Sequence, residues 1–207
     1  MPFRIEPVFS GFPVVIIAGG ESVTARDFHS IAIARLENRI RVIAVSDAVY
    51  PAWWADWLHS CDMKWWTAHI QRVQHFPGIK TTLDPLVPRQ WAGLLQNTGK
   101  EGFDPDPENC RTGANSSYQA MHCSIHAYGS EICLVGVDVN NGGYWFGGHQ
   151  FSRIDVDRTE VMLPHFSGLV PELEARKIKV VNASKPSLLD IWPKVDLQTY
   201  LDAVCGR

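Results

Sequence analysis

The stretch VVIIAGGES at residues 14–22 is the part of the sequence that decides the fold. Its first five residues are apolar and mostly β-branched, which predicts a strand buried on both faces. The glycine pair ends that strand, and Ser22 or Thr24 can then cap a helix. The segment RVIAV at residues 41–45 predicts the next strand. Together these elements predict a βαβ unit.

The same alternation of strands and helices continues along the chain. It predicts helices near residues 64–73, 117–128 and 166–173, and strands at 56–61, 78–83, 131–137 and 179–182. Residues 84–111 are rich in Pro and Gly and predict a loop-rich insertion or small lobe within a single domain, residues 1–207. The whole pattern predicts an α/β protein with a mostly parallel sheet and helices on both faces.

Composition and charge narrow the range of partners. The 207-residue chain has a net charge of -3 and a pI of about 6.2, which argues against binding to duplex nucleic acid. Eight Trp residues leave single-stranded bases as a weaker option. No apolar run is long enough to span a bilayer, and the five cysteines are irregularly spaced, so we expect a cytoplasmic protein. A homo-oligomer is compatible with this composition.

Polar residues follow the predicted strands at their carboxyl ends. In a parallel sheet these ends meet at one edge, where ligands bind near the switch in strand order. Asp47, Asp62, Asp138 and Asn182 stand at such ends, as does the GGES of residues 19–22. The three aspartates can bind Mg²⁺, contact a ribose or act as a base, or they can simply form turns. We expect all these residues to gather along one rim of the sheet.

Two glycine-bearing turns precede predicted helices and are candidates for phosphate binding. The first consists of Gly19, Gly20 and Ser22, and the second is TGANSS at residues 112–117, with Thr112, Gly113, Asn115 and Ser116 as its candidate contacts. Amides at a helix N-terminus attract anions, so we expect those of Gly20 and Gly113 to hold a phosphate. The alternative is a tight turn and a helix cap, which use the same residue types. An anion next to Glu21 requires that side chain to point away.

Aromatic and histidine residues complete the candidate site. The segment GGYWFGG at residues 142–148 has glycines on both sides of an aromatic cluster, as a closing lid has, and it leads to His149, a candidate general base. The alternative is an ordinary surface loop. Trp65 can stack on a base or sugar, or pack in the core. His122 and His126 have a metal-binding spacing, but no third ligand stands near them, so no metal site is assigned.

These segments, in this order, resemble a group of phage and prophage proteins, the DUF115-like proteins. The matching segments are Gly-Gly-x-Ser and Ser-Asp after strands, SCDMKWW at residues 60–66, Thr-Gly-x-Asn-Ser, Gly-x-Asp, Gly-Gly-His and a final Asn-Ala. The resemblance runs from Val14 to about Pro193. It extends to archaeal hydroxymethylpterin pyrophosphokinases and to bacterial sialyltransferases of the Campylobacter type. Glu21 stands where the first motif of the group has proline.

The resemblance implies a Rossmann-like core and a nucleotide-binding transferase, in the first place a glycosyltransferase with a nucleotide-sugar donor. It implies donor contacts at Gly19, Gly20, Ser22, Asp47 and residues 112–116. Asp138 and His149 are the candidate catalytic residues, with His149 as the base. Relatives of the pyrophosphokinase type instead transfer a diphosphate from ATP with Mg²⁺, which is the second alternative. The third is a non-catalytic phage protein that binds or sequesters a nucleotide in the host cytoplasm.

Overall fold

A seven-stranded sheet forms the centre of the molecule in a computed structural model that describes residues 2–147 and 157–206. Every strand pairing in this sheet is parallel, and the strand order is β5-β4-β3-β2-β1-β8-β9. The predicted α/β, Rossmann-like class is confirmed. The strands are β1 (Pro13–Ile17), β2 (Arg41–Val45), β3 (Trp57–His59), β4 (Ile79–Thr82), β5 (Gly93–Leu94), β8 (Glu131–Val135) and β9 (Lys179–Asn182).

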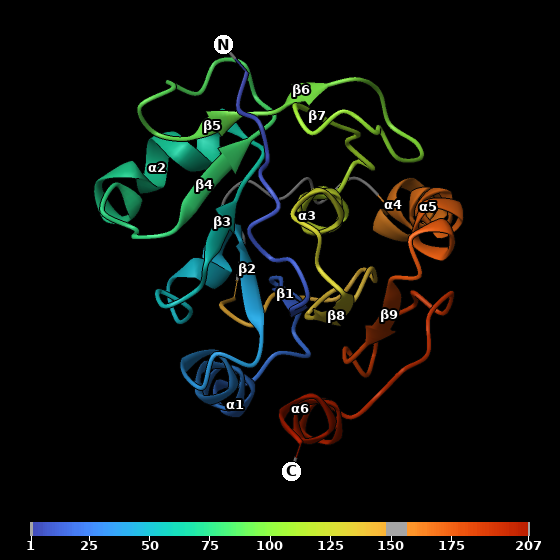
Figure 1. Ribbon diagram of the computed structural model, residues 1–207. Coiled ribbons are helices and arrows are strands. Elements are labelled where there is room, and N and C mark those ends of the chain that lie inside the picture. The colour runs from blue at the N-terminus through green and yellow to red at the C-terminus, as the bar shows by residue number, and fades with distance from the viewer. Residues whose placement is uncertain (1, 148–156, 207) are drawn as a thin grey trace.

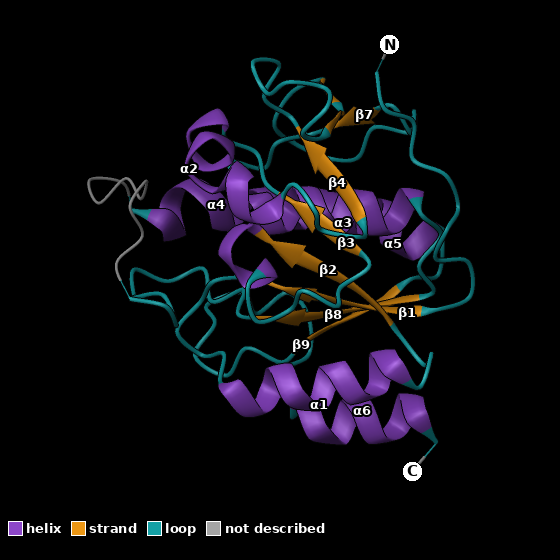
Figure 2. Cartoon of the chain, turned by 90° about the vertical axis from the view of Figure 1, so that its left-hand side faces the viewer, coloured by secondary structure: helices purple, strands orange, loops and turns teal. Residues whose placement is uncertain are grey.

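Helices cover both faces of the sheet (Figure 1 and Figure 2). One face packs against α1 (Ala25–Leu36), α2 (Met63–Val73) and α6 (Leu197–Cys205). The other packs against α3 (Ser116–His126), α4 (Arg158–Phe166), the short 3-10 helix η2 (Ser167–Leu169) and α5 (Val170–Ala175). Side chains alternate along β1, so that Val15 and Ile17 belong to the first core and Val14 and Ile16 to the second. The apolar run therefore had to be continuous, because both of its faces are buried.

Local signals fix the ends of several helices. Thr24, one of the two predicted caps, begins α1: its hydroxyl accepts the Asp27 amide, and the Asp27 carboxylate accepts the Thr24 amide in return. Pro171 lies at the start of α5, where proline fits the first helical turn. The 3-10 helix η1 (Ser46–Val49) follows β2 directly.

Residues 84–111 hold only short regular segments among their described residues. Within this range β5 extends the main sheet at its edge, where it pairs with β4. A separate two-stranded sheet is formed by β6 (Gln96–Asn97) and β7 (Asn109–Cys110). The rest of the range is turn and loop, as its content of proline and glycine predicts.

The strand order changes direction at β1. From β1 the chain builds outward through β2, β3, β4 and β5, and it then returns to place β8 on the other side of β1. In an open parallel sheet a change of this kind places the usual ligand site at the carboxyl ends of the strands beside it, which here are β1 and β8. No helix among the described residues has the length and apolar character that crossing a bilayer requires.

Candidate functional site

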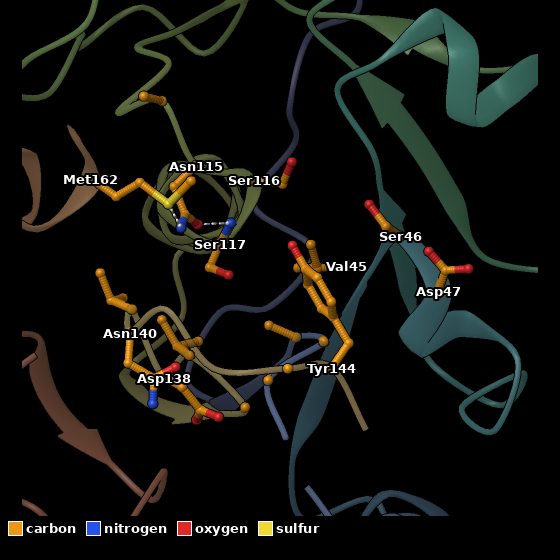
Figure 3. A pocket seen from close by; sticks show the side chains of 18 of the residues that line it. Val45, Ser46, Asp47, Asn115, Ser116, Ser117, Asp138, Asn140, Tyr144 and Met162 are labelled. Carbon is orange, nitrogen blue, oxygen red and sulfur yellow. Dashed lines mark hydrogen bonds between the residues drawn. The ribbon is translucent and has the colours of Figure 1, made fainter. Parts of the chain in front are cut away.

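A cavity of about 370 Å³ lies at this switch point (Figure 3). Its size is within the usual range for sites that bind small molecules. It is bounded by the turns after β1, β2 and β8, by the N-terminus of α3 and by one side of α4. The polar and aromatic residues that line it are Ser46, Asp47, Asp62, Asn115, Ser116, Ser117, Asp138, Asn140, Tyr144 and Phe146.

The structure brings most of the predicted site residues to this cavity. Those that line it are Gly19, Gly20, Asp47, Asp62, Asn115, Ser116 and Asp138. Four others, Ser22, Trp65, Thr112 and Gly113, are not part of its lining. Asn182 is fully buried at the end of β9, where its side chain donates to the Leu189 carbonyl, so it is not part of the rim. His149 lies outside the described residues.

Two loops form one wall of the cavity, and each holds the other with an acidic side chain. The buried Asp138 carboxylate, after β8, accepts the Ser22 amide at 3.0 Å and the Ser22 hydroxyl at 2.5 Å. In return, Glu21, after β1, accepts the Gly143 amide at 3.2 Å. We call these contacts the loop clasp. The Glu21 side chain thus points toward the 140–147 loop. Both Asp138 oxygens are used to hold this wall in place.

Gly20 is required in the clasp because nothing larger fits there. A Cβ atom at this position would lie 2.4 Å from Asp138 Oδ2 and 2.6 Å from the Gly136 carbonyl oxygen. The Gly20 amide already donates to that carbonyl at 2.9 Å. The expectation that this amide holds a phosphate is therefore wrong for this conformation: the glycine serves close packing between two loops.

The second wall is the N-terminal turn of α3, which we call the α3 wall. Asn115 is the cap, and its side chain accepts the amides of Ser117 and Tyr118. The Gly113 amide donates to the Lys100 carbonyl at 2.9 Å, so the expected phosphate contact through this amide is also wrong. The Ser116 amide, in contrast, has no hydrogen-bond partner among the described residues, as is usual in the first turn of a helix.

Ser117 is the residue of the α3 wall that sequence reasoning left out. It is only 5% exposed, it lines the cavity, and its hydroxyl has no hydrogen-bond partner within residues 2–147 and 157–206. Figure 3 shows its side chain pointing into the cavity from the first turn of α3. The signal was present in the sequence, because Ser117 is the second residue after the cap and belongs to the same TGANSS turn. Met162, contributed by α4, could be found only from the tertiary structure.

The carboxylate of Asp47 is held from behind by aromatic residues of α2. Trp65 Nε1 donates to Asp47 Oδ2 at 3.0 Å, and His69 Nε2 lies 3.9 Å from Asp47 Oδ1. Trp65 is 2% exposed, and its ring packs against Trp66 and His69. In this conformation Trp65 is therefore not a stacking surface for a ligand but orients a carboxylate that lines the cavity.

A stacked aromatic pair covers the end of β1. The rings of Tyr144 and Phe146 lie 5.2 Å apart at an interplanar angle of 25°, and both line the cavity. A Cβ atom on Gly19 would lie 3.1 Å from each ring, so the first glycine of the pair makes room for these aromatics. Trp145 points the other way and packs edge-on against Phe28 of α1. The 140–147 loop is thus anchored by one ring and presents two others to the cavity.

His122 and His126 lie inside the molecule, away from the cavity. The Phe103 ring packs against both imidazoles, and His122 Nε2 hydrogen-bonds the Gly102 carbonyl oxygen at 3.1 Å. Burial lowers the pKa of His122 to about 3 and that of His126 to about 4. The described residues contain no group of three or more His, Cys, Asp or Glu that could hold a metal ion.

The fold and this cavity define an α/β protein of the Rossmann-like type with a ligand-sized site at the switch point of a parallel sheet. No family model matches the chain, and no curated protein matches it. The narrower resemblance to phage DUF115-like proteins therefore stays a prediction.

Solved structures with glycosyltransferase folds superpose on most of the chain. The MAf glycosyltransferase from Magnetospirillum magneticum AMB-1 does so with a TM-score of 0.63 at 14% identity, over 96% of this chain and 35% of the other. The chain thus spans about a third of that protein. The sialyltransferase CstII from Campylobacter jejuni, solved with the substrate analogue cytidine-5'-monophosphate, has a TM-score of 0.52 at 11% identity, over 90% of this chain and 85% of the other. The chain shares its fold with these transferases.

Proposed function

We propose that this protein is a glycosyltransferase that binds the nucleotide part of a nucleotide-sugar donor in the switch-point cavity. One observation carries the proposal: the cavity lies at the carboxyl ends of β1 and β8 and at the start of α3, in a fold shared with two glycosyltransferases. One of these, the Campylobacter sialyltransferase, was solved in complex with cytidine-5'-monophosphate. A crevice at this place in an open parallel sheet is the usual ligand site.

The α3 wall is suited to the phosphate of the donor. The Ser116 amide and the Ser117 hydroxyl supply two donors at the positive end of a helix of 11 residues. No Lys or Arg occurs among the described lining residues, so in this part of the chain the helix end is the main source of positive potential. A single phosphate, as in a monophosphate-linked sugar, matches one such helix end.

The remaining lining residues suit the rest of the donor. Asp47 lines the cavity, and a carboxylate there can accept hydroxyl groups of a ribose or sugar. Tyr144 and Phe146 offer apolar ring surface to a base or sugar. In the proposed reaction His149 takes the proton of the acceptor hydroxyl. The acceptor oxygen bonds to the sugar carbon as the nucleotide phosphate leaves with the electrons of the old bond.

Binding is tested first, with CMP, UDP, ATP and a CMP-sugar titrated by calorimetry, with and without Mg²⁺. We expect at least one of them to bind with a Kd below millimolar. Ser117→Ala should weaken that binding about tenfold, because it removes a hydrogen bond to a charged group. Ser130→Ala, an exposed serine beyond the other end of α3, is the matched control and should bind as the wild type does. If no ligand binds, the nucleotide proposal fails.

Turnover is tested by incubation with the bound donor and candidate acceptors. Release of the nucleotide together with transfer of the sugar supports the proposal. His149→Ala should abolish transfer and keep donor affinity, and unchanged turnover in this variant would show that His149 is not the base. Tight binding with recovery of the unchanged ligand would select the non-catalytic alternative.

A second candidate function rests on two carboxylates. Asp47 and Asp62 both line the cavity, and carboxylate oxygens are the protein ligands that Mg²⁺ prefers. They fit a diphosphate transferase in which Mg²⁺ neutralises the phosphates of ATP. Strict dependence on Mg²⁺ and release of AMP from ATP would select this reaction over glycosyl transfer.

A further inference from the structure

A series of hydrogen-bonded buried polar groups, which we call the polar chain, runs from β3 and β4 of the sheet to the α3 wall. Trp57 Nε1 donates to Thr81 Oγ1 at 2.7 Å, and Thr81 Oγ1 lies 3.0 Å from His59 Nδ1. His59 Nε2 lies 2.8 Å from Gln119 Oε1, and Gln119 Nε2 donates to the Thr112 carbonyl oxygen at 2.9 Å. The four side chains are between 0% and 3% exposed. The chain thus joins β3 and β4 to the turn that begins α3.

The hydrogen bonds in this chain have one direction. Because Gln119 Nε2 donates to Thr112, Gln119 Oε1 is an acceptor and His59 Nε2 must carry the proton. His59 Nδ1 then accepts from the Thr81 hydroxyl, which in turn accepts from Trp57. This arrangement needs a neutral imidazole, and burial lowers the pKa of His59 to about 4. Each donor and acceptor in the polar chain has its hydrogen-bond partner as long as the neighbouring side chains stay in place.

The polar chain ends at the turn of residues 112–115, whose backbone is strained. Gly113 and Ala114 both have positive φ, +51° and +50°, and the second of these is a conformation that residues with a Cβ rarely adopt. The Thr112 carbonyl oxygen accepts the Asn115 amide across the turn, in addition to Gln119. Ala114, Asn115, Ser116 and Ser117 follow and line the cavity. A strained backbone persists only where its surroundings hold it, and Gln119 supplies that hold from inside the core.

At the sheet end of the polar chain, the packing of the core does not require polar side chains. Apolar residues of similar volume can fill a core position between a sheet and a helix without a network that must be fully satisfied. What the polar chain adds is a fixed point, the Thr112 carbonyl, one turn away from the candidate phosphate contacts. Ser116 and Ser117 thus follow a turn that is hydrogen-bonded to a glutamine that does not itself line the cavity.

We propose that Gln119, oriented by His59, is a positioning residue that fixes the 112–115 turn and thereby sets the affinity of the α3 wall for its ligand. This inference rests on the proposed function for the nature of the ligand. Gln119 acts through the turn and not by contact with the ligand.

The test compares Gln119→Met, which keeps the length of the side chain but not its hydrogen bonds, with Met121→Ala on the same helix. Met121 is fully buried, and its truncation destabilises the core without touching the turn. We expect Gln119→Met to bind CMP at least tenfold more weakly, and its amides at residues 113–117 to exchange hydrogen faster. We expect Met121→Ala to lower the Tm and to keep the wild-type Kd below its unfolding temperature.

Two results would overturn the inference. One is a wild-type Kd together with wild-type exchange at residues 113–117 in Gln119→Met, and the other is an equal loss of affinity in Met121→Ala. Should Gln119→Met fail to fold, Gln119→Leu replaces it, since it also removes the hydrogen bond to Thr112 and adds no polar group to this buried position. If the wild type binds none of CMP, UDP, ATP and the CMP-sugar, the proposed function fails; if it binds one of the others in place of CMP, that ligand is used for the comparison of Kd values. The exchange rates at the turn still decide the role of Gln119.

Discussion

The two walls of the cavity are held in opposite ways. The loop clasp uses ionisable carboxylates, Asp138 and Glu21, which reach across from one loop to backbone and hydroxyl donors of the other. The α3 wall is held by neutral groups, His59 and Gln119, deep in the core. The Asp138 carboxylate is buried but accepts two donors of the opposite loop, whereas the groups behind the α3 wall are neutral and must all be paired with one another because no water reaches them. The walls should therefore respond differently to substitution.

Acid should produce the largest effect, and it should act on the core around α3. Burial lowers the folded-state pKa of His59 to about 4 and that of His122 to about 3, below the unfolded value of about 6.5. Below about pH 6.5 the unfolded chain therefore binds more protons than the folded one, and the free energy of unfolding decreases as the pH is lowered. His126, whose pKa burial lowers to about 4, contributes in the same way, so the three groups together give a slope of up to about 4 kcal/mol per pH unit between pH 6 and pH 4.5. Urea unfolding at a series of pH values measures it.

His122→Phe separates this effect from general acid unfolding. The variant removes one of the three protons that unfolding takes up, so the slope in this window should fall by about 1.4 kcal/mol per pH unit. The exposed His75→Ala is the control variant. A slope that His122→Phe leaves unchanged would mean that buried histidines do not govern the acid response of this core.

Gly20→Ala tests how tightly the loop clasp is packed. Its methyl group would lie within 2.6 Å of Asp138 and of the Gly136 carbonyl, so one of the two loops has to move. We expect a loss of about 3 kcal/mol in the free energy of unfolding, at the upper end of typical overpacking costs, together with loss of ligand binding. The measurements are chemical denaturation and calorimetry with CMP.

Gly11→Ala is the control for Gly20→Ala. Gly11 has φ of +80° but open space around the position of a Cβ, so alanine there meets only a conformational cost of about 1 kcal/mol. Equal losses in the two variants would contradict the close packing inferred for Gly20.

Asp138→Asn and Glu21→Gln compare the two halves of the clasp, and both should cost less than Gly20→Ala. Asp138 is buried and accepts two hydrogen bonds from Ser22, one of which an amide group cannot accept, so we expect a loss of about 2 kcal/mol. Glu21 is exposed and accepts one amide, and its replacement should cost about 0.5 kcal/mol or less. Thermal unfolding of both variants measures the difference.

Activity assays on the same pair also bear on the predicted catalytic role of Asp138. If Asp138→Asn abolishes turnover while its donor Kd stays at the wild-type value, Asp138 acts in the chemistry. If Kd and turnover change together, its role is to hold the loop.

Much of the fold could be predicted from local pattern. The run at residues 14–18 is apolar on both faces, and a strand of that kind belongs in a sheet that is covered twice. Thr24, Asn115 and Pro171 mark helix starts because capping depends on side chains within a few residues. The gathering of Asp47, Asp62 and Asp138 at one rim followed from the rule that parallel strands end on the same side.

The roles of individual residues could be predicted less well from the sequence. The sequence favoured phosphate contacts at the amides of Gly20 and Gly113, but both amides donate to carbonyls of other loops. It left two roles open for Trp65, stacking on a ligand or packing in the core, and the ring is buried behind Asp47. Each of these outcomes depends on a partner distant in sequence, which local pattern does not reveal.

By itself the sequence determined the order and type of the elements and the edge of the sheet where a site would form, because hydrophobic periodicity, caps and glycine turns act over a few residues. Only the tertiary structure decided which groups face the cavity and which hold its walls, since those contacts join residues as far apart as Ser22 and Asp138. The same residue types serve both purposes. The role of such a residue depends on whether its donors and acceptors form hydrogen bonds with another loop or stay available for a ligand.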